Sequence, residues 1–111
     1  MIILLSPATR VDIIPEVTLE NWRIQEIVSE KGTTYHFIGF INERGRISTP
    51  IASLDTELRE GHTASGRFYK LVGPPGDMAD VELNAIYSAS LLRYEAISAR
   101  DVTLDLLGKK H

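Results

Sequence analysis

Short runs of β-branched and aromatic residues, separated by clusters of Gly, Pro, Asn and Asp, occupy most of the chain. This pattern is typical of β-strands joined by tight turns. Lys31-Gly32 and Ser65-Gly66 should form hairpin turns, because glycine tolerates the positive φ that such turns need. The expected strands fall within residues 1–5, 22–29, 34–41, 46–54, 62–64, 67–72 and 99–107, and residues 11–19 are expected to form either an edge strand or an extended arm.

Three features indicate where individual strands lie in the sheet. Residues 34–41 are apolar on both faces, which favours a central strand. Pro15 and Pro50 cannot donate a hydrogen bond to a neighbouring strand, so their segments should lie at an edge or contain a bulge. Trp22, the only tryptophan, should be buried near the start of a core-facing strand, with Ile24 on the same side.

One long helix is expected in the C-terminal half of the chain. Residues 73–76 (Gly-Pro-Pro-Gly) should end the sheet, and Asp77 should cap a helix that runs to about Glu95. The acidic residues of the first turn should stabilise the helix, because negative charge at its N-terminus interacts favourably with the helix dipole. The sequence thus predicts a single α+β domain over residues 1–111, an antiparallel, partly rolled sheet of five to seven strands with this helix packed on it.

The expected helix carries two apolar stripes on opposite sides. The first stripe should lie against the sheet and consists of Met78, Val81, Ala85, Ala89, Leu92 and Ala96. The second stripe consists of Leu83, Tyr87, Leu91 and Tyr94. Because one helix cannot present both sides to one flat sheet, we expect the second stripe to contact a partner protein or a second copy of this chain. The alternative is that the N-terminal arm, residues 1–19, covers it.

Composition narrows the class of protein. With 111 residues, 43% of them hydrophobic and 24% charged, the chain has the usage of one ordinary globular domain. The absence of cysteine excludes disulfides and thiolate chemistry. The apolar start, residues 1–5, is far below the roughly 20 residues of a membrane span. We therefore expect a soluble cytoplasmic protein without membrane contact.

Few residues suggest chemistry. None of the three histidines has a neighbour at a metal-binding spacing, so no metal site is expected, and His36 should be a packed residue of its strand. No serine sits in a nucleophile-elbow motif and no phosphate-binding glycine motif occurs. The glycines and prolines of residues 73–76 fit a rigid corner better than an anion-binding loop. The chain is therefore expected to be no enzyme and to bind no cofactor.

A cluster of basic and aromatic residues in the middle of the chain gives an alternative. Cations interleaved with aromatic rings are typical of β-domains that bind single-stranded nucleic acid. The candidate residues are Arg44, Arg46, Arg67, Phe68, Tyr69 and Lys70. The formal net charge of -3 opposes this interpretation, because nucleic-acid affinity comes largely from positive charge.

These observations favour a small non-enzymatic binding or regulatory protein of the compact kind common in bacteria and phages. It should act through protein contacts, with another protein or as a homodimer. The alternative function is a small nucleic-acid-binding β-barrel, although nucleic acid is not the expected partner. A third is a small-ligand-binding barrel or an enzyme.

Overall fold

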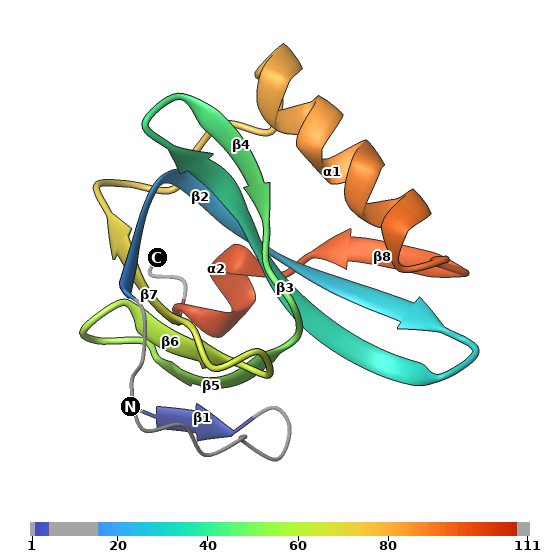
Figure 1. Ribbon diagram of the computed structural model, residues 1–111, viewed down its shortest axis with the longest axis horizontal. Helices are drawn as coiled ribbons and strands as arrows, with labels where there is room; N and C mark the ends of the chain where they lie inside the picture. Colours follow the sequence, from blue (N-terminus) through green and yellow to red (C-terminus); the bar gives the residue numbers. More distant parts are fainter. Residues whose placement is uncertain (1, 5–15, 109–111) are drawn as a thin grey trace.

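The computed structural model describes residues 2–4 and 16–108. It has a mixed sheet with one long and one short helix, so the predicted α+β class is confirmed. Figure 1 shows the long helix on one side of the sheet. The elements in chain order are β1 (Ile2–Leu4), β2 (Glu16–Ser29), β3 (Gly32–Ile41), β4 (Arg44–Ile47), β5 (Ile51–Asp55), β6 (Glu60–Thr63), β7 (Phe68–Val72), α1 (Val81–Arg93), β8 (Ser98–Asp101) and α2 (Thr103–Leu106).

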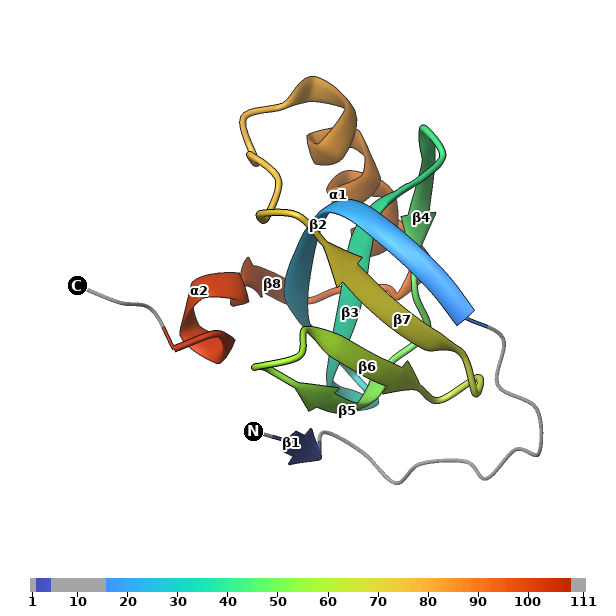
Figure 2. The same cartoon turned by 90° about the vertical axis from the view of Figure 1, so that its left-hand side faces the viewer.

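The sheet is mixed, not purely antiparallel as expected. Its strand order is β1-β5-β6-β7-β2-β3-β4, with β8 also paired to β2. Among the described strands, the parallel contact joins the first part of β2 to β7, in register from Glu16 opposite Phe68 to Glu20 opposite Val72. Strands β3 to β6 form the long connection that a parallel pair requires. These strands curve so that β7 returns to β2, and the two strands lie side by side in Figure 2.

Strand β2 is longer than expected, because the predicted arm and the strand after it form one element. The register between β2 and β3 shifts between Glu20 and Arg23, where Asn21 takes a positive φ of 50°. The bulge lets one strand pair with β7 in its first half and with β3 in its second. The predicted strand over residues 46–54 is in fact two, β4 and β5, and the break contains Pro50.

The core lies inside the roll of the sheet. Trp22 is fully buried, as predicted, and its indole N–H donates to the carbonyl oxygen of Gly73 at 3.1 Å. Around it the apolar side chains of several strands form one cluster. The buried members are Val17, Leu19, Trp22, Ile24, Phe37, Ile51, Leu54, Tyr69, Leu71 and Val102.

Helix α1 packs on the sheet through the stripe opposite to the expected one. Leu83 is only 1% exposed, whereas Val81 and Leu92 are 82% and 83% exposed. Leucine and tyrosine bury more apolar area against the sheet than alanine does, so the stripe with the large side chains faces inward. The expected assignment of the two faces is therefore wrong. The helix also begins later than predicted, with Asp80 as N-cap accepting from the backbone N–H of Leu83 at 3.0 Å.

The C-terminal segment differs from the predicted single strand over residues 99–107. Its first part is β8, and α2 follows directly. The carboxylate of Asp101 accepts a hydrogen bond from the backbone N–H of Thr103 at 3.0 Å, which turns the chain. Val102 then lies in the core, and Leu106 packs against this core. The two residues are four positions apart, and a helix places such residues on the same face.

The N-terminal arm contributes strands where the structure describes it. Residues 2–4 pair with β5, and residues 16–20 pair with β7, so neither part lies over α1 (Figure 1). The part of the expected cover in residues 5–15 lies outside the described residues. Within the described ranges no helix is long and apolar enough to cross a membrane.

Candidate functional site

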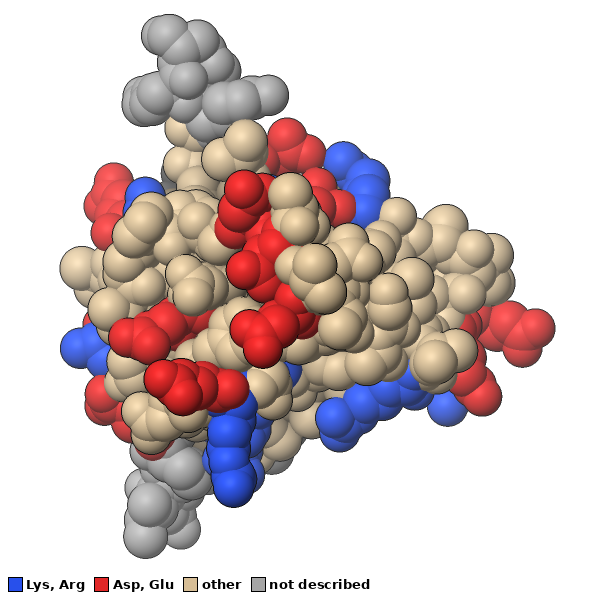
Figure 3. All heavy atoms as spheres, turned by 90° about the horizontal axis from the view of Figure 1, so that it is seen from above, with Lys and Arg blue, Asp and Glu red and all other residues tan. Residues whose placement is uncertain are grey.

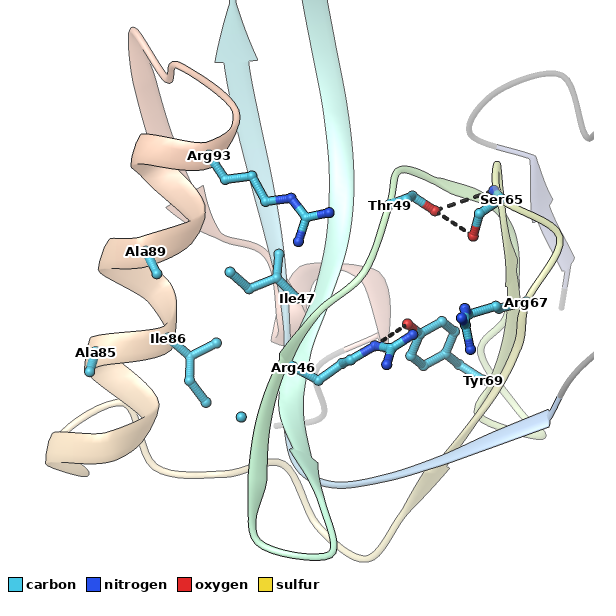
Figure 4. Close-up of a pocket in the computed structure, with 11 residues that line it drawn as sticks. Arg46, Ile47, Thr49, Ser65, Arg67, Tyr69, Ala85, Ile86, Ala89 and Arg93 are labelled. Atoms are coloured by element: carbon cyan, nitrogen blue, oxygen red, sulfur yellow. Dashed lines mark hydrogen bonds between the residues drawn. The ribbon is translucent and has the colours of Figure 1, made fainter.

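A cleft of about 690 Å³ lies between α1 and the hairpin that joins β6 to β7, with β4 between these two walls (Figure 4). Helix α1 lines one wall mainly with small and apolar side chains, and the hairpin lines the other with polar ones. The lining residues are Gly45, Arg46, Ile47, Thr49, Ser65, Arg67, Tyr69, Ala85, Ile86, Ala89 and Arg93.

Three arginines from three different elements line this cleft, and none of the described residues that line it has a carboxylate. Arg46 belongs to β4, Arg67 precedes β7, and Arg93 ends α1. In the described part of the chain none of the three forms an ion pair, whereas Arg23 and Arg100 both pair with acidic side chains. Guanidinium groups gathered without a counter-ion repel one another and attract an anion. We call these three residues the arginine triad.

Aromatic rings position two members of the triad. The Nε of Arg46 donates to the Tyr69 hydroxyl at 3.1 Å, and its guanidinium carbon lies 6.0 Å from the centre of that ring. The guanidinium carbon of Arg93 lies 5.5 Å from the centre of the Tyr94 ring. Such cation–π contacts orient a guanidinium without neutralising its charge. The positive charge of both side chains thus stays available.

Two hydroxyl groups complete the polar wall. The Thr49 hydroxyl donates to the Ser65 hydroxyl oxygen at 3.0 Å and accepts from the Ser65 backbone N–H at 3.3 Å. These bonds join the chain after β4 to the β6–β7 hairpin at one end of the cleft, on the side away from α1 (Figure 4). Because a hydroxyl can both donate and accept, this end of the cleft can bind a polar ligand group.

The sequence-based basic cluster is divided by the fold. Arg46, Arg67 and Tyr69 line the cleft, whereas Arg44 and Lys70 are exposed outside it. Phe68 packs against His62 with 4.9 Å between ring centres, because alternate residues of β7 point to opposite faces. Sequence reasoning missed Arg93, since no local pattern indicates that the end of α1 meets a hairpin from the middle of the chain.

The four residues expected to form a partner interface lie on the sheet side of α1. Leu83 belongs to the core, and Tyr87 and Leu91 are half-buried. The Tyr94 hydroxyl donates to the carbonyl oxygen of Ser48 at 3.1 Å. Leu83 therefore has no surface left for a partner. A protein that binds α1 from outside would meet the stripe that contains Val81 and Leu92.

His36 is a packed residue, as expected from its apolar strand. Its Nδ1 donates to the carbonyl oxygen of Ser48 at 2.9 Å, so its Nε2 accepts from the Thr34 hydroxyl at 2.8 Å. The ring lies against Tyr94, with 4.1 Å between ring centres. Burial lowers the pKa of His36, and the positive charge of Arg93 lowers it further. The hydrogen bond to Ser48 raises the pKa but does not outweigh these two effects. These contacts fit a neutral, structural imidazole.

We expect an NMR titration of the His36 ring proton to give a pKa below the ordinary value of 6.5. A lowered histidine pKa means that the unfolded chain takes up the proton first, so the stabilising effect is present above pH 6.5 and is lost as the pH falls below it. The free energy of unfolding should accordingly decrease on acidification from this pH. A measured pKa at or above 6.5 would contradict the buried, neutral ring.

Acidic residues gather on a different part of the surface. Glu20, Glu43, Asp80 and Glu82 border a separate hollow, of about 380 Å³, near the start of α1. Figure 3 shows acidic side chains in a band on this face, next to an uncharged stretch over α1. Although the net charge is -3, charges of opposite sign are separated on the surface. Negative charge lies near the start of α1, and positive charge lies in the cleft.

The chemistry of the cleft suits binding. Guanidinium groups remain protonated at all physiological pH values and donate hydrogen bonds, so they hold an anion without exchanging protons with it. Arginine can also form two parallel hydrogen bonds to one carboxylate or phosphate group.

Compared with known proteins, the chain matches no family model, no curated protein and no solved structure.

Proposed function

We propose that this protein is a small non-enzymatic binding domain that recognises an acidic segment of a partner protein in the cleft lined by the arginine triad. The observation that carries the proposal is the arginine triad, three guanidinium groups around one cavity whose lining, in the part of the chain that the structure describes, contains no carboxylate. An acidic ligand would supply the missing negative charge. Hydrogen bonds between charged groups are also stronger than neutral ones, which favours such a ligand further.

A protein ligand is favoured over nucleic acid by the position of the aromatic rings. Single-stranded nucleic acid gains much of its affinity by stacking bases on exposed rings. Among the described residues that line the cleft, only Tyr69 has an aromatic ring, and this ring is buried and its hydroxyl is bonded to Arg46. The acidic band near the start of α1 would also repel a long phosphate backbone.

The proposal is tested with a short fluorescent peptide in which Glu and Val alternate. The double variant Arg67→Gln/Arg93→Gln should weaken its binding at least about tenfold, because a hydrogen bond to a charged group contributes about 1.5–3 kcal/mol. Added salt should also weaken binding of the parent protein. Fluorescence anisotropy measures both effects. Arg46 is kept, since its bond to Tyr69 also serves the fold.

The matched control is Arg44→Gln/Lys70→Gln, which removes the same charge from exposed positions outside the cleft. This control should bind the peptide within about twofold of the parent, since neither side chain lines the cleft and both are exposed to solvent, where salt screens their charges. Equal weakening by both double variants would mean that the cleft is not the site. Tighter binding of an unlabelled oligonucleotide than of the peptide, lost in the cleft variant, would favour the nucleic-acid alternative instead.

A further inference from the structure

Strand β4 is an end strand of the sheet and pairs, among the described strands, with β3 alone. The β3–β4 turn consists of Asn42 and Glu43, both at positive φ, so Ile41 and Arg44 form the first hydrogen-bonded pair. Hydrogen-bonded and non-bonded pairs alternate along an antiparallel ladder. The Ser48 backbone N–H, which donates to the Phe37 carbonyl oxygen at 2.9 Å, continues this alternation.

The same alternation determines which backbone groups of β4 remain open. Gly45 and Ile47 lie at the non-bonded positions, opposite Phe40 and Ile38, so their N–H and C=O groups point away from β3. Both residues line the cleft. The cleft therefore contains an open strand edge as well as the arginine triad.

Helix α1 covers the face of β4 and leaves this edge beside it. A Cβ atom on Gly45 would lie 2.9 Å from the Ile86 side chain, so the helix packs directly on the face of the strand. A Cβ direction is perpendicular to the sheet, whereas the edge groups lie in its plane. An unpaired edge of this kind pairs readily with an additional strand.

The two walls beside the edge differ in chemistry. On the helix side lie Ala85, Ile86 and Ala89, and on the hairpin side lie Ser65 and Arg67. In Figure 4, Ile47 points toward the helix and Arg46 toward the hairpin. An added strand has the same two-residue period, so its side chains would also alternate between the walls.

We propose that the acidic ligand binds as an extended peptide strand added to the edge of β4. This inference rests on the proposed function and adds the binding mode and the sequence pattern of the ligand. Its backbone exchanges hydrogen bonds with Gly45 and Ile47. Every second side chain is acidic and meets the arginine on the hairpin wall. The side chains between are small and apolar and contact the helix wall, with Arg93 near the end of that wall.

The test uses an acetylated, amidated Glu-Val-Glu-Val-Glu peptide and versions with a single N-methylated amide. Methylation removes one backbone donor and keeps every side chain. Methylation of amides that face β4 should weaken binding at least about tenfold, because in antiparallel pairing alternate amides point to the same neighbour. Methylation of the amides between them should change binding by less than about twofold. A peptide with the same composition but grouped Glu and Val residues should bind more weakly than the alternating one.

A second measurement observes the protein. In a ¹⁵N-labelled sample, saturating peptide should slow amide hydrogen exchange at Gly45 and Ile47, and should leave exchange at Arg44 and Arg46 unchanged, since their amides already pair with β3. Binding that requires Arg67 and Arg93 but is indifferent to the methylation position would overturn strand addition and leave the proposed function standing. No binding of any of these peptides, or binding insensitive to both arginines, would overturn the proposed function itself.

Discussion

Replacing Trp22 with alanine is expected to lower the free energy of unfolding by about 3 to 5 kcal/mol. The indole is fully buried among the strands of the roll, so its removal leaves a cavity that a rigid sheet closes only partly. The change also leaves the carbonyl oxygen of Gly73 without its donor. Urea denaturation followed by circular dichroism measures the effect.

Leu58→Ala is the matched control for a surface change, because Leu58 is 66% exposed in the turn between β5 and β6. It should change the free energy of unfolding by less than about 0.5 kcal/mol. A Trp22→Ala variant as stable as this control would contradict the core position of the indole. Trp22→Phe should fall between the two, since the phenyl ring keeps part of the buried volume.

Replacing Asp101 with alanine is the second large effect, expected to cost about 2 to 4 kcal/mol. Its carboxylate accepts two bonds from Arg23, at 2.7 and 2.9 Å, and one from the Gln25 side chain at 2.6 Å. It also accepts the Thr103 backbone N–H that begins α2. The substitution therefore leaves several hydrogen-bond donors without an acceptor, at a site where the Arg23 and Asp101 side chains are only 17% and 22% exposed.

The acid dependence of stability provides an independent check. Burial alone would raise the pKa of Asp101, but the bonds from Arg23, Thr103 and Gln25 outweigh it and hold the pKa below the ordinary value of 3.8. The stabilising effect is thus present above pH 3.8 and is lost as the pH falls below it. The parent protein should lose stability in this acid range more steeply than Asp101→Ala does.

Asp105→Asn provides the control for Asp101→Ala. Asp105 pairs with Arg100 at 3.2 Å, but the two side chains are 55% and 61% exposed. Solvent screens such an exposed pair, so it adds little to stability and the control should unfold almost like the parent. If Asp101→Ala were no more harmful than Asp105→Asn, Asp101 would not be the residue that joins β8 and α2 to β2.

Local sequence signals were sufficient for most individual elements. Gly66 takes the positive φ of 90° that the β6–β7 turn requires, and β4, which precedes Pro50, lies at an end of the sheet, although the division of residues 46–54 into two strands was not predicted. Trp22 is buried as expected, and residues 34–41 lie within β3, an interior strand that pairs with β2 on one side and β4 on the other, although it is next to the end of the sheet and not at its centre. Each of these outcomes depends on the conformational range or apolar area of residues close together in sequence, which a single sequence contains.

Tertiary structure alone decided how the elements meet. The parallel contact of β2 with β7, the face of α1 that is buried, and the short helix α2 all depend on surfaces distant in sequence. The candidate cleft has the same origin, since Arg46, Arg67 and Arg93 come from three separate elements. A helix with two apolar stripes can bury either one, and the choice follows from the area that the facing sheet can cover. Hydrophobic periodicity records that each stripe is apolar, but not which surface the fold will bring against it.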